Sequence, residues 1–327
     1  MIARPKMIAR LRSVLAVAGL AIAAAAGAQE RPIRILVGFA PGGGSDMVAR
    51  LVADSMSKSL GAPVVVENKP GMNGILAAEA LKHAAPDGRT LMVAPIVVTV
   101  FAPLTHAKLR YDPIKDFAPV SLAATFQMAL AVGSASPART VREYVEWVRA
   151  DSSKAAYGIP TAGGPPHFFG FMLARATGLD LTPVPYKGGG PLVNDLIGGQ
   201  VPAGITVLPE LLKHHESGKL RILATSGAER SPMAPAVPTF KEAGFAGIEG
   251  SGWQAFHTTA GTPRAVIERL SAAIAAAINA PEVKERLLAL GMEPVGSTSD
   301  ELARRMVQDT ARWAPVIKAS GFRADDP

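Results

Sequence analysis

The chain has 327 residues, which is enough for about two domains. Hydrophobic residues make up 48% of it and charged residues 19%, a composition that fits a globular protein and excludes a disordered one. The net charge is +7, but four basic residues precede residue 28, and without them 30 basic residues stand against 27 acidic ones. That small excess gives no reason to expect nucleic acid as a partner. The absence of cysteine excludes a disulfide scaffold, a thiol nucleophile, a zinc–thiolate site and a lipoprotein anchor.

The first 28 residues have the pattern of a secretory signal peptide. Residues 1–12 are basic, residues 14–26 are apolar, and Ala26-Gly27-Ala28 supplies small residues, so we expect cleavage after Ala28. The apolar run is shorter than the roughly 20 residues that span a bilayer, which argues against a membrane anchor. We therefore expect a soluble mature protein in the periplasm.

Strands and helices alternate along the rest of the chain. Apolar and β-branched runs predict strands at 33–39, 64–66, 90–94, 128–132, near 157, at 220–224 and at 253–258. Helical spacing predicts helices from about 45, and at 75–84, 141–149, 167–177, 192–197, 263–279, 281–290 and 299–319. Thr298 and Glu301 have the spacing of a capping box. The alternation predicts parallel βαβ units and an α/β fold.

The order of these elements suggests two α/β domains, with the second inserted into the first. The pattern restarts after a stretch rich in Pro and Asp at 111–119. We expect residues 29–127 and 254–327 to form domain I and residues 128–253 to form domain II. The chain would cross between the domains near 126–130 and 250–256.

Two glycine-rich turns, residues 39–46 and 186–191, each lead into a predicted helix. Glycine lets the backbone approach a ligand closely, and the first turn of a helix offers unpaired N–H groups and a positive dipole end. Two such turns on two domains could hold one anion from both sides. The alternative is that each is a structural turn, with Asp46 and Asp195 as caps or braces and Lys187 merely solvated.

The usual catalytic and metal-binding motifs do not occur. Residues 42–47 lack the last glycine of G-x-G-x-x-G, no P-loop exists, and Ser45 does not stand in G-x-S-x-G. His214 and His215 are adjacent and cannot share a helix face, whereas His167 follows a glycine–proline turn and could line a pocket. We expect no catalytic residues, no metal and no cofactor.

Short motifs in a fixed order resemble those of the Bug (TctC-like) family, the extracytoplasmic solute-binding receptors of tripartite tricarboxylate transporters. The motifs are Pro32-Ile33-Arg34, Pro41-Gly42-Gly43, Glu67-Asn68-Lys69-Pro70-Gly71, Ala85-Pro86-Asp87-Gly88, Tyr186-Lys187-Gly188, Gly198-Gly199-Gln200, Pro238-Thr239-Phe240 and Gly291-Met292-Glu293-Pro294. Each motif alone is weak, but the ordered set spans about residues 31–322.

The resemblance implies a two-domain periplasmic-binding-protein fold of type II, a Venus flytrap, with the ligand between the domains. In that family a ligand carboxylate is held largely by backbone N–H groups and ordered waters at turns that match 39–46 and 186–191. The candidate ligand-binding residues are Phe39, Pro41, Gly42, Gly43, Gly44, Ser45, Asp46, Thr99, Thr161, Gly163, His167, Tyr186, Lys187, Gly188, Gly189, Pro191 and Thr206, with Asp195 as a structural brace.

Three departures from the family pattern remove polar groups. Thr206 stands where the family usually has an acidic residue, Gly164-Pro165-Pro166 replaces side-chain hydroxyls before His167, and 94–99 is mostly apolar. These departures predict a more apolar distal pocket and a monocarboxylate, an aromatic acid or another apolar-tailed acid rather than citrate.

Three functions remain open at this point. The first is a monomeric receptor that delivers a small carboxylate to the permease subunits of a tripartite transporter. The second is a periplasmic subunit that signals to a membrane sensor. The third is an exported hydrolase or isomerase, for which the chain offers no nucleophile–base pair.

Overall fold

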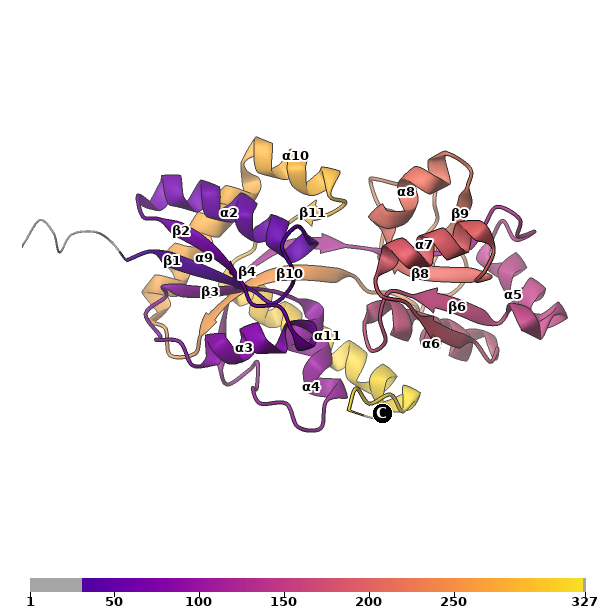
Figure 1. The fold of residues 1–327 in the computed structure, drawn as a ribbon, viewed down its shortest axis with the longest axis horizontal. Coiled ribbons are helices and arrows are strands. Elements are labelled where there is room, and N and C mark those ends of the chain that lie inside the picture. Colours follow the sequence, from indigo (N-terminus) through magenta and orange to yellow (C-terminus); the bar gives the residue numbers. More distant parts are fainter. Residues whose placement is uncertain (1–30, 326–327) are drawn as a thin grey trace, which may run out of the picture.

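The computed structural model describes residues 31–325, so the predicted signal peptide lies outside the described residues. The described chain folds into two lobes, each built on one β-sheet (Figure 1). We call the lobe with the six-stranded sheet lobe I and the lobe with the five-stranded sheet lobe II. Among the described residues, no helix is both long and apolar enough to span a membrane.

The sheet of lobe I has the strand order β11-β4-β10-β3-β1-β2. Its strands are β1 (Ile33–Val37), β2 (Val64–Asn68), β3 (Thr90–Pro95), β4 (Phe117–Phe126), β10 (Gly252–Thr259) and β11 (Glu293–Pro294). Its longer helices are α2 (Gly44–Leu60), α3 (Ile75–Lys82), α9 (Arg264–Asn279) and α10 (Pro281–Ala289). All of β3 is buried and β1 exposes only Arg34, as expected of central parallel strands covered on both faces.

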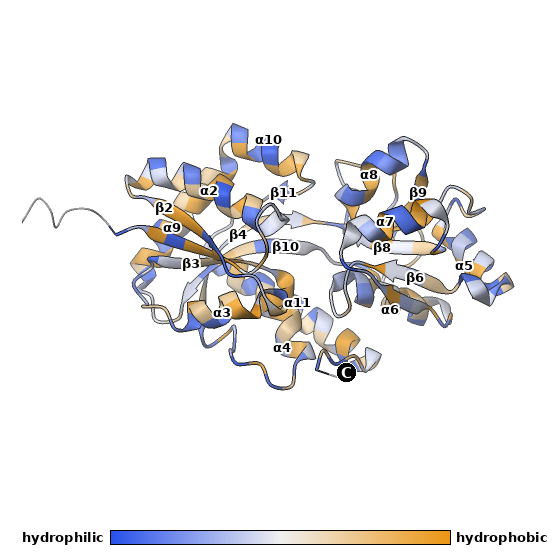
Figure 2. Ribbon diagram, viewed as in Figure 1, coloured by the Kyte–Doolittle hydropathy of each residue, from blue (hydrophilic) through white to orange (hydrophobic). Residues whose placement is uncertain are grey.

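The sheet of lobe II has the strand order β7-β6-β8-β5-β9. Its strands are β5 (Met128–Gly133), β6 (Ala156–Ile159), β7 (Thr182–Pro185), β8 (Ala203–Val207) and β9 (Leu220–Thr225). Its longer helices are α5 (Val141–Ala150), α6 (Pro165–Thr177), α7 (Gly189–Gly198) and α8 (Leu208–Glu216). In Figure 2 the helices carry both hydrophilic and hydrophobic residues, and α5 buries one face through Val141, Tyr144, Val145 and Val148.

The βαβ units are confirmed, because β1 pairs in parallel with β2 and β3, and β6 pairs in parallel with β7 and β8. The capping box of Thr298 and Glu301 is also confirmed, at the start of α11 (Ser299–Ser320). The prediction of parallel strands was incomplete, because β4, β5 and β10 pair with their neighbours only in antiparallel orientation.

Several elements escaped the sequence prediction. Strand β4 contains Pro119 and small residues, which hide its strand character, and it is stabilised by antiparallel pairing with β10 along its length. Strand β8 begins Ala-Gly, and α8 follows it without an intervening loop. The segment 97–105, to which the sequence analysis assigned no element, forms a π-helical turn η2 (Val97–Phe101) and the short α4 (Ala102–Thr105). Helix α7 starts three residues earlier than expected.

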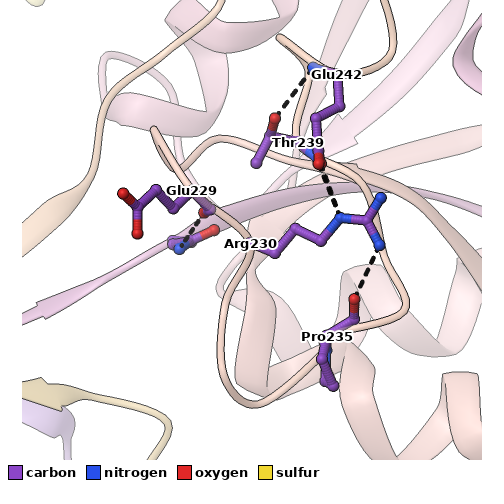
Figure 3. Close-up of polar contacts among 6 residues, drawn as sticks. Glu229, Arg230, Pro235, Thr239 and Glu242 are labelled. Atoms are coloured by element: carbon purple, nitrogen blue, oxygen red, sulfur yellow. Dashed lines mark hydrogen bonds and ion pairs between the residues drawn. The ribbon is translucent and has the colours of Figure 1, made fainter.

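The chain passes from one sheet to the other at Gln127 and returns through the long connection 226–251. Figure 3 shows how side chains fix this connection. The Arg230 guanidinium pairs with Glu242 at 2.9 Å and donates to the Pro235 carbonyl, while Thr239 and Glu242 bond each other's backbone N–H groups. The Gln127 amide donates to the Glu229 carbonyl at 3.2 Å and so ties the first crossing to the second.

Helix α11 joins the two lobes. In Figure 1 it runs from beneath lobe I towards α6 of lobe II. Its Trp313 ring lies 5.0 Å from the Phe101 ring of η2 and 5.3 Å from the Phe169 ring of α6, measured between centroids. Its buried Asp309 accepts a 2.8 Å hydrogen bond from the Trp253 indole at the second crossing. One hydrophobic cluster therefore spans both lobes.

We expect Trp313→Ala to lower the free energy of unfolding by about 3 to 5 kcal/mol, because it leaves a cavity where the two lobes meet. Urea unfolding followed by circular dichroism measures the loss. Val307→Ala, at a residue of the same helix that is 63% exposed, serves as the control and should change stability by less than about 0.5 kcal/mol. Equal losses in the two variants would contradict this role for Trp313.

Candidate functional site

The first glycine-rich turn connects β1 to α2. Gly42 has φ +84°, a left-handed conformation that favours glycine, and Gly43 is the N-cap of α2. The Gly42 and Gly43 N–H groups bond within the turn, to Asp46 at 2.9 Å and to the Ala40 carbonyl at 3.4 Å. The N–H groups of the first helical turn, from Gly44 to Asp46, have no intrahelical partner and face the end of the helix, where they can bind an anion.

Asp46 lies beneath this turn, and its carboxylate is used within lobe I. It accepts hydrogen bonds from Gly42 N–H, from the Arg50 guanidinium and from the Asn68 amide, each at 2.9 Å. Asn68 also donates to the Phe39 carbonyl at 3.1 Å. Burial raises the pKa of Asp46, but these hydrogen bonds outweigh it and hold the pKa at about 2. The structure thus places Asp46 as a brace of the turn.

The second glycine-rich turn connects β7 to α7. Gly188 is the N-cap of α7 with φ +104°, and its N–H donates to the Pro160 carbonyl at 3.0 Å. The Tyr186 hydroxyl donates to Asp195 at 3.0 Å, which ties the turn to the body of α7. Burial and this contact with Asp195 raise the pKa of Tyr186 to about 12. Lys187 and Pro191 are exposed beside the turn.

Glu210, in the first turn of α8, covers the start of α7. Its carboxylate occupies the space that a Cβ atom of Gly189 would need, and it accepts a hydrogen bond from the Thr206 hydroxyl. Partial desolvation raises the pKa of Glu210, although the residue is exposed. Two of the predicted ligand-binding residues, Gly189 and Thr206, are therefore in contact with a carboxylate of the protein itself.

A mostly apolar cavity of about 380 Å³ lies between the lobes beside the first turn. We call it the apolar cavity. Lobe I contributes Phe39, Met72 and Phe101, and lobe II contributes Thr161, Ala162 and Gly163. Phe322, which follows α11, closes one side: its ring lies 4.9 Å from the His167 ring and packs on Gly163. Predicted residues from both lobes thus meet in one cavity.

His167 does not line the apolar cavity itself but contacts Gly163, which does. Its Nδ1 accepts a hydrogen bond from Gly163 N–H at 3.2 Å, and its ring stacks on Phe168. Burial lowers the pKa of His167, which favours the neutral ring that this acceptor role requires. Thr99 is buried in η2, and its hydroxyl has no hydrogen-bond partner among the described residues.

A second cavity, of about 320 Å³, lies beside Gly44 at the start of α2. We call it the Glu210 cavity. It is lined by Gly44 and Gln254 of lobe I and by Val207 and Glu210 of lobe II, with Met292 covering Gly44. Gln254 also accepts a 2.9 Å hydrogen bond from Ser45, so this hydroxyl is directed to the crossing strand β10.

The sequence analysis did not identify the acidic residue Glu210 as part of the site. Glu210 follows a strand that was not predicted, so its place at the carboxyl end of that strand gave no signal. Phe101 and Phe322 were missed because each is distant in sequence from the glycine-rich turns. Within residues 31–325 no group of three His, Asp or Glu side chains could hold a metal ion.

Comparisons with known proteins identify the family. The profile of the TctC family, described as "Tripartite tricarboxylate transporter family receptor", matches residues 48–322. The chain is 32% identical over 323 residues to protein BugT of Bordetella pertussis, covering 97% of this chain and 98% of that protein. The chain belongs to the TctC family.

Solved structures of similar proteins agree with this assignment. A structure described as a periplasmic transporter is 36% identical, covers 91% of this chain and 100% of its own, and has a TM-score of 0.78. R. palustris Rpa4515 with adipate is 31% identical, covers 90% and 98%, and has a TM-score of 0.79. MatC from Rhodopseudomonas palustris with bound malate is 32% identical, covers 88% and 99%, and has a TM-score of 0.75.

The expected family and the two-sheet periplasmic-binding-protein fold are therefore confirmed. As a TctC receptor the chain is a solute-binding protein and not an enzyme, and this excludes the alternative of an exported hydrolase or isomerase.

We expect the stabilisation of the first turn by the Asp46 carboxylate to make the stability of this TctC receptor depend on pH. Because folding lowers the pKa of Asp46 from 3.8 to about 2, its charge stabilises the folded state fully above pH 3.8, and this contribution disappears as the pH falls through 2. We expect Asp46→Asn to lower the melting temperature at pH 5 and the gap from wild type to close between pH 4 and pH 2.

Asp54→Asn, at an exposed position of the same helix, removes the same charge without touching the turn. Its melting temperature should follow that of the wild type at every pH. A gap for Asp46→Asn that persists at pH 2 would show that the variant acts by some means other than the ionised carboxylate.

Proposed function

We propose that this protein is the periplasmic receptor of a tripartite transporter and binds one small carboxylate between its lobes. The observation that carries the proposal is that the first glycine-rich turn contributes to two cavities with walls from both lobes: Phe39 lines the apolar cavity, and Gly44, the first residue of α2, lines the Glu210 cavity. A buried carboxylate needs several hydrogen bonds, and a helix N-terminus supplies them without a salt bridge. The bound adipate and malate of two relatives support the ligand class.

We propose that residues 29–127 with 254–327 form one domain and residues 128–253 the other, and that the two close on the ligand. Each cavity has walls from both lobes, so a ligand in contact with both would favour the closed arrangement over the open one. The closed form would deliver the ligand to the permease subunits of the membrane transporter. We propose that it does so as a monomer, after removal of residues 1–28.

The apolar cavity supports an apolar portion in the ligand. Its walls include Phe39, Phe101, Ala162 and Phe322, and the polar groups that the family usually supplies near His167 are replaced by Gly164-Pro165-Pro166. A ligand whose carboxylate lies on the first turn of α2 would place an aliphatic or aromatic tail there. Citrate, with three carboxyl groups, would fit such walls poorly.

Gly43→Val should abolish carboxylate binding while leaving the fold intact. Gly43 has φ −76° and an ideal Cβ would meet only the Ala40 carbonyl at 3.5 Å, so the backbone tolerates a side chain, but that side chain would crowd the N–H groups of α2. A ligand at 100 times its dissociation constant raises stability by about 2.7 kcal/mol, which a thermal-shift assay resolves.

Gly247→Val, at an exposed glycine of lobe II with free space around it, is the matched control and should retain binding. The assay compares both variants with the wild type over mono-, di- and tricarboxylates, amino acids and neutral sugars. Stabilisation of wild type by neutral sugars alone, or retention of carboxylate binding by Gly43→Val, would contradict the proposed anchoring.

The apolar cavity predicts that affinity rises with tail length. From acetate to hexanoate, each buried methylene should tighten binding by roughly fourfold, as measured by calorimetry. Ala162→Asp places a charge at the exposed rim of this cavity and should flatten that series, whereas Ala246→Asp, in the exposed part of the connection 226–251, should not. Tight binding of citrate with no response to monocarboxylates would overturn the apolar-tail proposal.

A further inference from the structure

Glu210 places a negative charge in the region where the proposed function places an anionic ligand. Its carboxylate lies against Gly189 at the start of α7, where a second carboxylate of the ligand would otherwise find N–H groups. The Glu210 side chain also lines the cavity that contains Gly44, the first residue of α2. A ligand held by α2 would therefore lie close to this acidic side chain.

No basic side chain of the described residues forms an ion pair with this carboxylate. Among residues 31–325, the one side-chain partner of Glu210 is the Thr206 hydroxyl. Lys187, on the neighbouring turn, is exposed and pairs with no acidic residue of the described chain. Partial desolvation raises the pKa of Glu210, although the residue is exposed, so its carboxylate is accessible to a ligand.

The other acidic residues near the two turns are already paired or bonded. Asp46 is held by Arg50 and Asn68, and Asp195 accepts the Tyr186 hydroxyl. Glu293, beside the Glu210 cavity on β11, contacts Ser231 at 3.4 Å. Glu210 is thus the acidic side chain of the cavity wall that is open to a new partner.

We propose that Glu210 is a specificity-determining residue that pairs with a positively charged nitrogen of the ligand. This inference rests on the proposed function, since it assumes a carboxylate on the first turn of α2. The ligand class then narrows to carboxylates that also carry an ammonium group, with their apolar portion in the apolar cavity. Dicarboxylates are disfavoured, because their second carboxylate would lie beside that of Glu210 and the two like charges repel.

Four acids with six carbons test the proposal by calorimetry. Hexanoate carries only the anchoring carboxylate, 2-aminohexanoate and 6-aminohexanoate add an ammonium group at either end, and adipate adds a second carboxylate. We expect one of the amino acids to bind wild type roughly 10- to 100-fold more tightly than hexanoate, and adipate to bind more weakly than hexanoate. The position of the preferred amino group reports how far Glu210 lies from the anchored carboxylate.

Glu210→Gln retains the shape of the side chain and removes its charge. It should abolish the preference for the amino acid, leave hexanoate binding unchanged and improve adipate binding. Glu216→Gln, at an exposed position of the same helix, removes the same charge away from the cavity and should behave as wild type. Thr206→Val, which removes the hydroxyl that positions Glu210, should reduce the preference in part.

The outcomes separate the inference from the function on which it rests. Binding of hexanoate or adipate by wild type, with no preference for either amino acid, would overturn the role of Glu210 and leave the carboxylate receptor intact. An amino-acid preference that persists in Glu210→Gln would overturn it equally. Failure of wild type to bind any of the four acids would contradict the proposed function, and the inference would fall with it.

Discussion

The packing of α11 across both lobes is the constraint on which the binding region depends. Two crossings of the chain, near Gln127 and Ser251, connect the sheets, and strands alone leave the lobes free to rotate. Trp313 fills the space between Phe101 of lobe I and Phe169 of lobe II, and Asp309 holds Trp253 at the second crossing. Because the two turns lie on different lobes, this contact determines how they face each other.

The two glycine-rich turns use the same physical principle with different supports. Each leads into the first turn of a helix, whose N–H groups carry a partial positive charge without a basic side chain. The first is braced by a buried carboxylate that takes up the N–H of Gly42, and the second by a tyrosine hydroxyl bonded to Asp195. These braces hold the backbone in place, so ligand binding need not order it.

The two cavities beside the first turn differ in character, and this difference bears on ligand choice. One is walled by aromatic and small apolar residues, and the other contains the carboxylate of Glu210. A receptor that binds through backbone N–H groups gains affinity for any carboxylate, so discrimination between carboxylates must come from the walls around the anchor. In this chain the proposed selection by these walls is for an apolar tail and a positive charge.

The family, the alternation of strands and helices, and the two turns could be predicted from the amino-acid sequence, because they depend on local spacing, on glycine and on short motifs. Which residues the turns meet depends on the packing of the folded chain. Strand β4 depends on pairing with β10, more than a hundred residues away, and β8 was hidden by its small residues. Glu210 reaches Gly189, and Phe322 reaches Gly163, through contacts between segments that local periodicity does not connect. Side-chain contacts across such sequence separations form only when the chain packs, and the character of the binding region resides in them.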